Sequence, residues 1–496
     1  MHGRVLAKIT RVTLLNRSAR DRMGEFPLCW RITPMSMSDT IRFSDVVSAL
    51  SAALDLTEGQ PMGHATRSCI LGMRIAEELQ LGTQDRTHLY YALLLKDAGC
   101  STNAARMHNI LGSDDIRAKK EVKFEDWTKP SLSGLRYLMR NVLPGKSWAQ
   151  RVAKAVVVGL QQKKNNAEVI GARCERGAQI ARKVGLGEPT AQAIFSLDEH
   201  WNGGGYPEHR KGEEISVLAR IMNVSQTLEA FANQRSPAEA VAVVSQRSGT
   251  WFDPEIARIV RTLEKDEQLW ENARSENARQ YVLEMEPGAA MLATPQHIDN
   301  LCDAFAEIID TKSPYTYNHS LGVARAAIEI ANGLGLAAQT VTMVRRAALL
   351  HDIGKLSVSN AILEKPGKLT EPEWDVMKMH PVYTRAIVRT IAGFEQLAFV
   401  AAAHHERLDG KGYPDGLTAT HLPLTARILC VADVYQALTE KRPYREPMAK
   451  QAVFAMMDKD APNRLDPQCL DVLKQNSARD AQQDAAKAKA KAASAR

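Results

Sequence analysis

The sequence predicts an all-α fold. Apolar residues recur at positions i, i+3 and i+4 in LGVARAAIEIANGL (321–334), RILCVADVYQALTE (427–440) and QAVFAMM (451–457), which is the period of an amphipathic helix. No segment of any length shows the alternation of apolar and polar residues that predicts a strand. With 496 residues, of which 45% are hydrophobic, the chain is too long for one hydrophobic core. We therefore expect two or three helical domains.

Matching segments indicate that one of these domains is duplicated. Four pairs occur in the same order: ALDLTEGQPMGHATRSC (53–69) with IIDTKSPYTYNHSLGVA (308–324), LYYALLLKDAGC (89–100) with VRRAALLHDIGK (344–355), YPEHRKGEEISVLARIMNVSQ (206–226) with YPDGLTATHLPLTARILCVAD (413–433), and WFDPEI (251–256) with RLDPQC (464–469). Internal similarity of this kind predicts repeated structural units. We therefore predict an N-terminal half (residues 38–265) and a C-terminal half (residues 293–478), joined by a linker (residues 266–292).

The N-terminal half is longer because it carries an insertion. From Asp97 to Cys174 there are 77 residues, whereas the corresponding interval from Asp352 to His380 has 28, so about 49 residues are extra. We place this insertion at about residues 101–165, where it includes the helix-breaking stretch KPSLSGLRY.

Both ends of the chain differ in composition from its middle. Residues 1–36 carry seven Arg/Lys against two Asp/Glu (+5), and residues 479–496 carry five against two (+3), so together they exceed the net charge of +7. The folded middle is close to neutral, so the basic balance says little about partners, and we expect no duplex nucleic acid as a partner. We expect residues 1–37 to be disordered or untranslated, with a start at Met35 or Met37. We expect residues 479–496 to be an Ala/Lys-rich disordered tail or a frayed helix.

Neither a membrane span nor an export signal is predicted. No apolar run approaches the ~18 residues that a membrane-spanning helix needs. The first 34 residues have arginines throughout and lack the apolar segment of a signal peptide. We therefore expect a cytoplasmic protein.

Histidines and aspartates are concentrated in the C-terminal half. Imidazole and carboxylate are the ligands of divalent Fe, Mn and Zn, and this set is too large for one tetrahedral site. Seven ligands suit two metal ions that share a bridging carboxylate, and two adjacent ions lower the pKa of a shared water for phosphoester hydrolysis. Asp352 is the natural bridge, and Lys355 can stabilise charge on a phosphate. The seven candidate ligands are His319, His351, Asp352, His380, His404, His405 and Asp433.

Each of these motifs alone also has an ordinary structural interpretation. A His-Asp pair is common by chance, and a buried histidine is more often hydrogen-bonded in a core than bound to a metal. The GYP stretch alone is a turn. The specificity of the prediction lies in the combination and order of the motifs.

The combination resembles the HD-GYP family, a branch of the HD-domain metal-dependent phosphohydrolases. The motifs that carry the resemblance are HDIGK (351–355), HP at His380, HHE followed by DGKGYP (404–414), ADVYQALT (432–439) and RPYRE (442–446). The resemblance implies tandem HD-domain helical bundles and hydrolysis of cyclic di-GMP to pGpG or GMP with non-haem iron or manganese. The expected partner is cyclic di-GMP, and a homodimer or a GGDEF-type signalling partner is compatible with it.

The resemblance also assigns roles to individual residues. The seven candidate ligands match the family's metal ligands, and Asp352 and Lys355 are the expected catalytic residues. The expected substrate-binding residues are Lys355, Gly412, Tyr413, Pro414, Arg442 and Arg445. Members with three metals place a glutamate four residues before the first ligand histidine, where this chain has Tyr315. We therefore expect two metals, and the end product stays open between pGpG and GMP.

The N-terminal half has lost most of the candidate ligands. It keeps His64 and Asp97, but at the other ligand positions it has Lys96, Cys174, Leu197, Asp198 and Gln226. A lysine adds positive charge where a metal would sit, so this half is predicted to be non-catalytic. It is either a spacer or a pseudoenzyme module that regulates the C-terminal half.

Alternative functions for the whole chain are hydrolysis of another nucleotide, such as a mixed cyclic dinucleotide, and a cyclic-di-GMP-responsive adaptor. The intact ligand set disfavours the adaptor.

Overall fold

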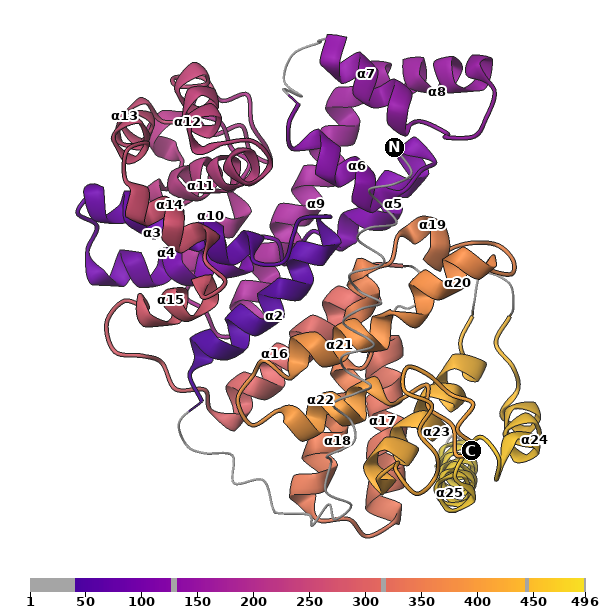
Figure 1. The fold of residues 1–496 in the computed structure, drawn as a ribbon. Helices are drawn as coiled ribbons and strands as arrows, with labels where there is room; N and C mark the ends of the chain where they lie inside the picture. Colours follow the sequence, from indigo (N-terminus) through magenta and orange to yellow (C-terminus); the bar gives the residue numbers. More distant parts are fainter. Residues whose placement is uncertain (1–40, 126–131, 314–317, 442–445, 495–496) are drawn as a thin grey trace. The chain divides into compact units, whose positions relative to one another are not determined.

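The computed structural model describes residues 41–125, 132–313, 318–441 and 446–494. Within these ranges the chain forms helices and no extended strand, so the predicted all-α fold is confirmed (Figure 1). Residues 1–37, including the two candidate start methionines, lie outside the described residues. Among the helices that the structure describes, none is both long and apolar enough to span a bilayer.

The N-terminal half and the linker contain the first set of helices. Helix α3 packs against α4 and α11, and this group forms the centre of the N-terminal half. The helices are α2 (Phe43–Thr57), α3 (His64–Glu78), α4 (Thr83–Leu95), α5 (Thr102–Leu111), α6 (Asp115–Val122), α7 (Leu132–Asn141), α8 (Trp148–Leu160), α9 (Gln162–Lys183), α10 (Glu188–Phe195), η2 (Gly212–Glu214), α11 (Val217–Gln234), α12 (Pro237–Gln246), α13 (Pro254–Leu263), α14 (Glu267–Arg274) and α15 (Ala278–Glu284). Helices α5 to α8 occupy the stretch predicted as an insertion.

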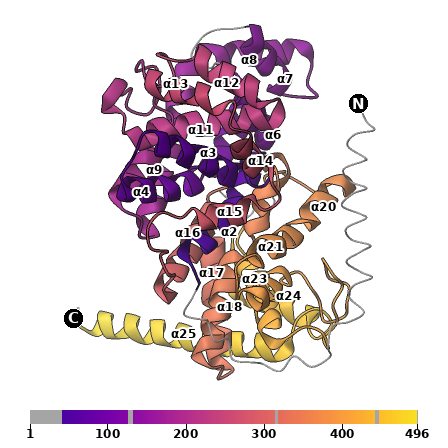
Figure 2. The same ribbon diagram turned by 60° about the vertical axis from the view of Figure 1, so that its left-hand side comes forward.

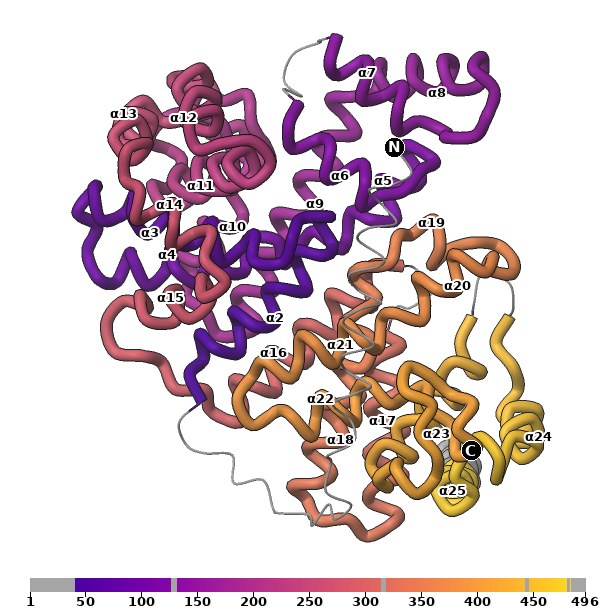
Figure 3. The backbone as a smooth tube through the Cα atoms, viewed as in Figure 1, coloured from indigo at the N-terminus to yellow at the C-terminus, as the bar shows by residue number. Residues whose placement is uncertain are grey.

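In the C-terminal half, α17 packs against α18 and α23, an arrangement that corresponds to α3, α4 and α11; the course of the chain can be followed in Figure 3. The helices are α16 (Pro295–Asp310), α17 (His319–Gly333), α18 (Ala338–Leu350), η3 (Ile353–Ser357), α19 (Asn360–Leu363), α20 (Glu371–Lys378), α21 (His380–Val388), α22 (Glu395–Ala402), α23 (Leu424–Thr439), α24 (Lys450–Asp460) and α25 (Pro467–Ser494).

Equivalent local contacts recur in the two halves. The Tyr206 backbone N–H donates to the carbonyl of Asp198 at 3.0 Å, and the Tyr413 N–H donates to that of His405 at 3.2 Å. Ion pairs join Arg220 to Asp253 and Arg427 to Asp466. These pairs fall at the positions that the repeat predicts, which supports the hypothesis of a duplication.

The C-terminal tail is helical where the sequence favoured disorder or fraying. Helix α25 continues without a break through residue 479 to Ser494, and its last turns extend beyond the helices it packs on (Figure 2). The physical reason is composition, because alanine and lysine have high intrinsic helix propensity.

Candidate metal centre

Helix α17 presents the first candidate ligand at its N-terminus. His319 is the first residue of the helix, and Asn318 before it adopts a left-handed conformation with φ 62°. The Asp310 carboxylate at the end of α16 accepts hydrogen bonds from the backbone N–H of Ser320 (3.0 Å) and from its hydroxyl (2.7 Å). Carboxylates stabilise the exposed N–H groups of a helix start. This cap fixes the position of His319.

The His-Asp pair follows the end of α18, where the chain turns sharply. At Gly354 a Cβ atom would lie 1.9 Å from the His380 carbonyl oxygen, so only glycine allows this approach. The Thr384 hydroxyl accepts from the Gly354 N–H at 3.1 Å and donates to the His351 carbonyl at 2.9 Å. These contacts hold α21, which begins at His380, against the turn that carries Asp352.

Three of the histidines have their ring orientation set by the same backbone contact. Each Nδ1 lies 2.6–2.7 Å from the carbonyl oxygen three residues earlier, in His351 (Ala348), His380 (Met377) and His404 (Ala401). A carbonyl can only accept, so each Nδ1 carries the proton and each Nε2 presents a lone pair. The three lone pairs are therefore available to a metal ion.

The Asp352 carboxylate lies between two groups of histidines. Its Oδ1 is 3.4 Å from His380 Nε2 and 3.6 Å from His404 Nε2. Its Oδ2 is 3.3 Å from His351 Nε2 and 3.9 Å from His319 Nε2. A carboxylate with one oxygen toward each group has the geometry of a bridging ligand.

Asp433 on α23 completes the arrangement. Its Oδ1 lies 3.3 Å from His319 Nε2, and its Oδ2 lies 3.8 Å from His405 Nδ1. The potential ligand atoms form two groups, one of His319, His351 and Asp433 and the other of His380, His404 and His405, with Asp352 close to both. The structure thus brings all seven predicted ligands together.

Several polar atoms of these residues lack hydrogen-bond partners and are suited to bind a divalent metal. Within the described residues, His351 Nε2 and Asp352 Oδ1 are buried and have no hydrogen-bond partner. The Nε2 atoms of His380 and His404 lie 3.1 Å apart, and two lone pairs so placed repel unless a cation lies between them. Two nitrogens bound at about 2.1 Å to one ion are separated by about this distance.

The electrostatics of the centre also suit a cation. Burial lowers the pKa of His404 to about 4 and that of His380 well below its ordinary value, so both are neutral near pH 7. Burial alone would raise the pKa of Asp352, but His351 and Lys355 outweigh it and hold this pKa well below the ordinary value. Neutral imidazoles and ionised carboxylates are the forms that bind metals.

The predicted substrate-binding residues divide into those beside the centre and those not described. Lys355 Nζ lies 2.6 Å from Asp352 Oδ2, and the Tyr413 ring lies 4.8 Å from the His405 ring. Gly412 packs so tightly against Glu406 that a Cβ would lie 2.5 Å from its Cα, and Pro414 follows Tyr413 in the same turn. Arg442, Arg445 and Tyr315 lie outside the described residues.

Two residues near the centre were not predicted from the sequence. Glu440 Oε2 lies 2.9 Å from His319 Nδ1, so it can orient that imidazole. It lies directly after α23, which ends at Thr439, and its backbone is extended with ψ 156°, so the helical pattern does not reach it. No pattern in the sequence could have identified Thr384, because its contacts are to backbone atoms.

The corresponding region of the N-terminal half holds a lysine. Lys96 is buried, and its ammonium contacts the carboxylate of Asp97. His64 contacts the Glu229 carboxylate, which also accepts from Arg67 Nε at 2.5 Å. Cys174 Sγ lies 3.7 Å from Asp198 Oδ2. Two of the replacing side chains, Cys174 and Asp198, thus contact each other, and a third, Lys96, pairs with the retained Asp97.

Comparison with known proteins identifies related chains. The HD domain family model matches residues 161–256 and 303–469. The 3′3′-cGAMP-specific phosphodiesterase 3 of Vibrio cholerae is 39% identical over 437 residues, covering 88% of this chain and 95% of that protein. A cyclic di-GMP phosphodiesterase response regulator of Xanthomonas campestris is 37% identical over 211 residues, covering 42% of this chain and 55% of that protein. A crystal structure described as a cyclic GMP-AMP-specific phosphodiesterase of V. cholerae has a TM-score of 0.61 and 36% identity, covering 88% of this chain and 97% of that one.

Proposed function

The chain belongs to the HD domain family, in its HD-GYP branch, and on this premise we propose that it is a metal-dependent phosphodiesterase that hydrolyses a 3′3′-cyclic dinucleotide. The observation that carries the proposal is the position of Asp352, whose two carboxylate oxygens face two separate groups of histidines. This is the arrangement that a pair of adjacent metal ions requires.

The seven residues would hold two divalent ions, with iron or manganese favoured by the histidine and carboxylate ligands. Bound ions of this kind supply a hydroxide near neutral pH and neutralise charge on the phosphoryl oxygens. Asp352 would contribute one carboxylate oxygen to each of the two ligand groups. Glu440 keeps the His319 imidazole oriented by accepting from its Nδ1.

Lys355 is the residue that would meet the phosphate. Its ammonium is partly exposed and paired with Asp352, so it can turn a proton toward a non-bridging oxygen as negative charge develops. Tyr413 lies beside His405 and offers a flat ring to a nucleobase. Trp374, 6.0 Å from Tyr413 between ring centroids, adds a second aromatic surface.

The mixed dinucleotide 3′3′-cGAMP is the favoured substrate. The relative that matches 88% of this chain is named as specific for it, whereas the cyclic di-GMP phosphodiesterase described above matches 42%. Cyclic di-GMP is the second candidate, because the C-terminal motifs are shared with that relative. The N-terminal half is, in this proposal, a degenerate copy without catalysis of its own.

The test measures metal content and turnover together. The protein would be purified anaerobically, its metals counted by elemental analysis, and kcat/KM measured for 3′3′-cGAMP, cyclic di-GMP and cyclic di-AMP. We expect about two metals per chain, highest kcat/KM for 3′3′-cGAMP, and loss of turnover in His351→Ala and Asp352→Ala. A metal-loaded parent protein that hydrolyses none of the three dinucleotides would contradict the proposed activity. Turnover in both variants equal to the parent would overturn the site.

A further inference from the structure

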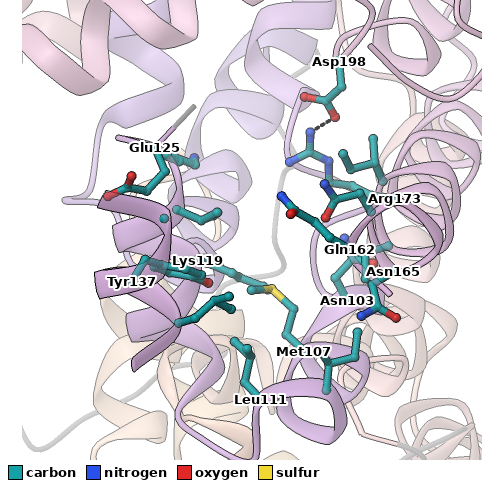
Figure 4. Close-up of a pocket in the computed structure, with 18 of the residues that line it drawn as sticks. Asn103, Met107, Leu111, Lys119, Glu125, Tyr137, Gln162, Asn165, Arg173 and Asp198 are labelled. Atoms are coloured by element: carbon teal, nitrogen blue, oxygen red, sulfur yellow. Dashed lines mark ion pairs between the residues drawn. The ribbon is translucent and has the colours of Figure 1, made fainter. Parts of the chain in front are cut away.

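The N-terminal half contains a cavity that the proposed chemistry does not use. Its volume is about 400 Å³, within the range of about 300–1,000 Å³ typical of small-molecule sites. One side is formed by Asp198 and Gln226, at the positions where the repeat predicts His405 and Asp433. The opposite walls come from the inserted helices α5 to α8 (Figure 4). The insertion therefore encloses the place where the ligands have been lost.

The cavity has an apolar wall and a polar wall. Met107, Leu111 and Leu138 form part of the apolar wall. On the polar side, Arg173 is paired with Asp198, and the side chains of Gln162 and Asn165 are directed toward the same space (Figure 4). Such a cavity suits a ligand with a flat apolar body and several hydrogen-bonding atoms.

Two features of the polar wall point to the chemistry of the ligand. Lys119 Nζ lies 3.7 Å and Lys123 Nζ 3.2 Å from the two oxygens of Glu58. Lys119 also donates to the carbonyls of Thr57 and Cys100, whereas the buried Lys123 Nζ makes no hydrogen bond within the described residues. The Asn103 side chain is 4% exposed, and its Oδ1 has no hydrogen-bond partner within the described residues. An oxygen acceptor would satisfy Lys123, and N–H donors would satisfy Asn103 and the Glu125 carboxylate, whose Oε2 also has no partner within the described residues. Phosphate and nucleobase N–H groups supply both.

Helix α6 connects this cavity to the candidate metal centre. Lys119 lines the cavity, and Asp115, one turn earlier on the same helix, is fully buried against the C-terminal half. Asp115 Oδ1 accepts a hydrogen bond from the Asn360 N–H at 2.8 Å, at the start of α19. A displacement of α6 would therefore act directly on the C-terminal half.

A second contact extends this connection to the turn that carries Asp352 and Lys355. Lys312 is buried, and burial lowers its pKa to about 8 while the nearby Asp115 carboxylate opposes the shift. Its ammonium donates to the Leu356 carbonyl at 2.8 Å. Leu356 belongs to η3, which begins directly after Asp352 and carries Lys355.

We infer that the cavity is a regulatory nucleotide site, which acts through α6 on hydrolysis at the metal centre. The site takes a nucleoside phosphate, with a phosphate oxygen near Lys123 and the base near Asn103. The regulatory part rests on the proposed function, whereas the binding part does not.

Binding is tested with GMP and AMP by calorimetry on the full chain in the His351→Ala background, so that the metal centre is disabled. Gly159 lines the cavity, and a Cβ atom added there would meet no atom of the described residues within 4 Å, which makes Gly159→Trp a filling variant and Gly159→Ala its matched control. We expect one GMP or AMP per chain, at least tenfold weaker binding in Gly159→Trp, and retained binding in Gly159→Ala. Absence of binding, or binding that Gly159→Trp leaves intact, would overturn the site.

Coupling is tested by hydrolysis of bis(p-nitrophenyl) phosphate, a generic diester, with and without GMP or AMP. We expect a change of at least threefold in kcat/KM in the parent, and none in Asp115→Ala. Asp114→Ala is the control, because Asp114 lies beside Asp115 but caps α6 itself and should keep the response. A parent that binds the nucleotide without any change in rate would overturn the coupling. Loss of cyclic dinucleotide hydrolysis with binding and diester response intact would overturn the proposed function alone.

Discussion

The two halves of the chain hold an aspartate at the same place and satisfy it in different ways. In the C-terminal half, Asp352 is surrounded by four imidazoles within 3.9 Å and by Lys355. In the N-terminal half, Asp97 is contacted by the ammonium of Lys96, which replaces a histidine. Burial alone would raise the pKa of Asp97, but Lys96 holds it below its ordinary value. A buried carboxylate needs a cation, which Lys96 supplies in the N-terminal half and the proposed metal ions would supply beside Asp352.

The largest expected effect is on kcat/KM, which a substitution in the C-terminal half should lower and the corresponding substitution in the N-terminal half should not. His380→Ala removes a predicted ligand whose Nε2 is 3.4 Å from Asp352, and we expect kcat/KM to fall by ~10³-fold or more, about 4 kcal/mol of transition-state stabilisation. Cys174→Ala, at the corresponding position, should change kcat/KM less than threefold. Steady-state kinetics with elemental analysis would measure both. Equal losses in the two variants would mean that the N-terminal half takes part in the chemistry.

The next effect concerns stability and belongs to the N-terminal half. Lys96→Met leaves the Asp97 carboxylate buried without its partner, which should lower the free energy of unfolding by about 3–5 kcal/mol. The double variant Lys96→Met/Asp97→Asn removes the charge as well and should recover much of the loss. Urea denaturation of metal-free protein measures both. If the double variant is no more stable than Lys96→Met, the pair is not what stabilises this centre.

A candidate ligand set could be proposed from the sequence because metal chemistry restricts residue types, and its role in metal binding stays a prediction. His319, His351 and Asp433 are far apart in the chain, were predicted from their residue types and the family resemblance, and lie together in the structure. Glu440 was missed because an acidic residue after a helix is usually solvated. From the sequence, Lys96 was predicted only to prevent metal binding. Its ion pair with Asp97 was not predicted, because the sequence does not show which groups an ammonium contacts.

The inserted region was the least predictable part of the fold. The four helices there gain their positions from tertiary contacts, such as that of the Tyr137 hydroxyl with the Ala118 carbonyl, which no local sequence pattern shows. The burial of Asp115 against the C-terminal half depends on tertiary packing and had no local signal. The helical tail, by contrast, could have been predicted from alanine and lysine propensity.

A smaller effect compares the glutamates that contact the first histidine of each half. Glu440→Gln weakens the orientation of His319, and we expect metal affinity and kcat/KM to fall by about 10–100-fold. Glu229 contacts His64 and Arg67 in the N-terminal half, so Glu229→Gln should lower thermal stability without changing turnover per bound metal. Metal titration and thermal unfolding distinguish the two. A loss of metal from Glu229→Gln would indicate that the N-terminal half binds an ion.

The smallest effect lies in the turn that both halves retain. Glu406 accepts hydrogen bonds from three backbone N–H groups, those of Asp415, Gly416 and Leu417, at 2.7–3.1 Å. A glutamine has one acceptor oxygen, so Glu406→Gln leaves at least one N–H poorly satisfied, at a cost of about 1–3 kcal/mol. Because the same turn carries Tyr413, we expect KM for the dinucleotide to rise up to about tenfold with a smaller change in kcat.

The matching glutamate of the N-terminal half provides the control for this turn. Glu199 accepts from the Glu208 N–H at 2.7 Å, so Glu199→Gln tests the same hydrogen bond away from the metal centre. Because the Tyr206 turn faces no metal centre, this variant should lose stability but keep KM. If both variants raise KM equally, the turn acts through global stability. If only Glu406→Gln does so, the turn positions Tyr413 for the substrate, and retention of the same turn in the N-terminal half reflects its structural role.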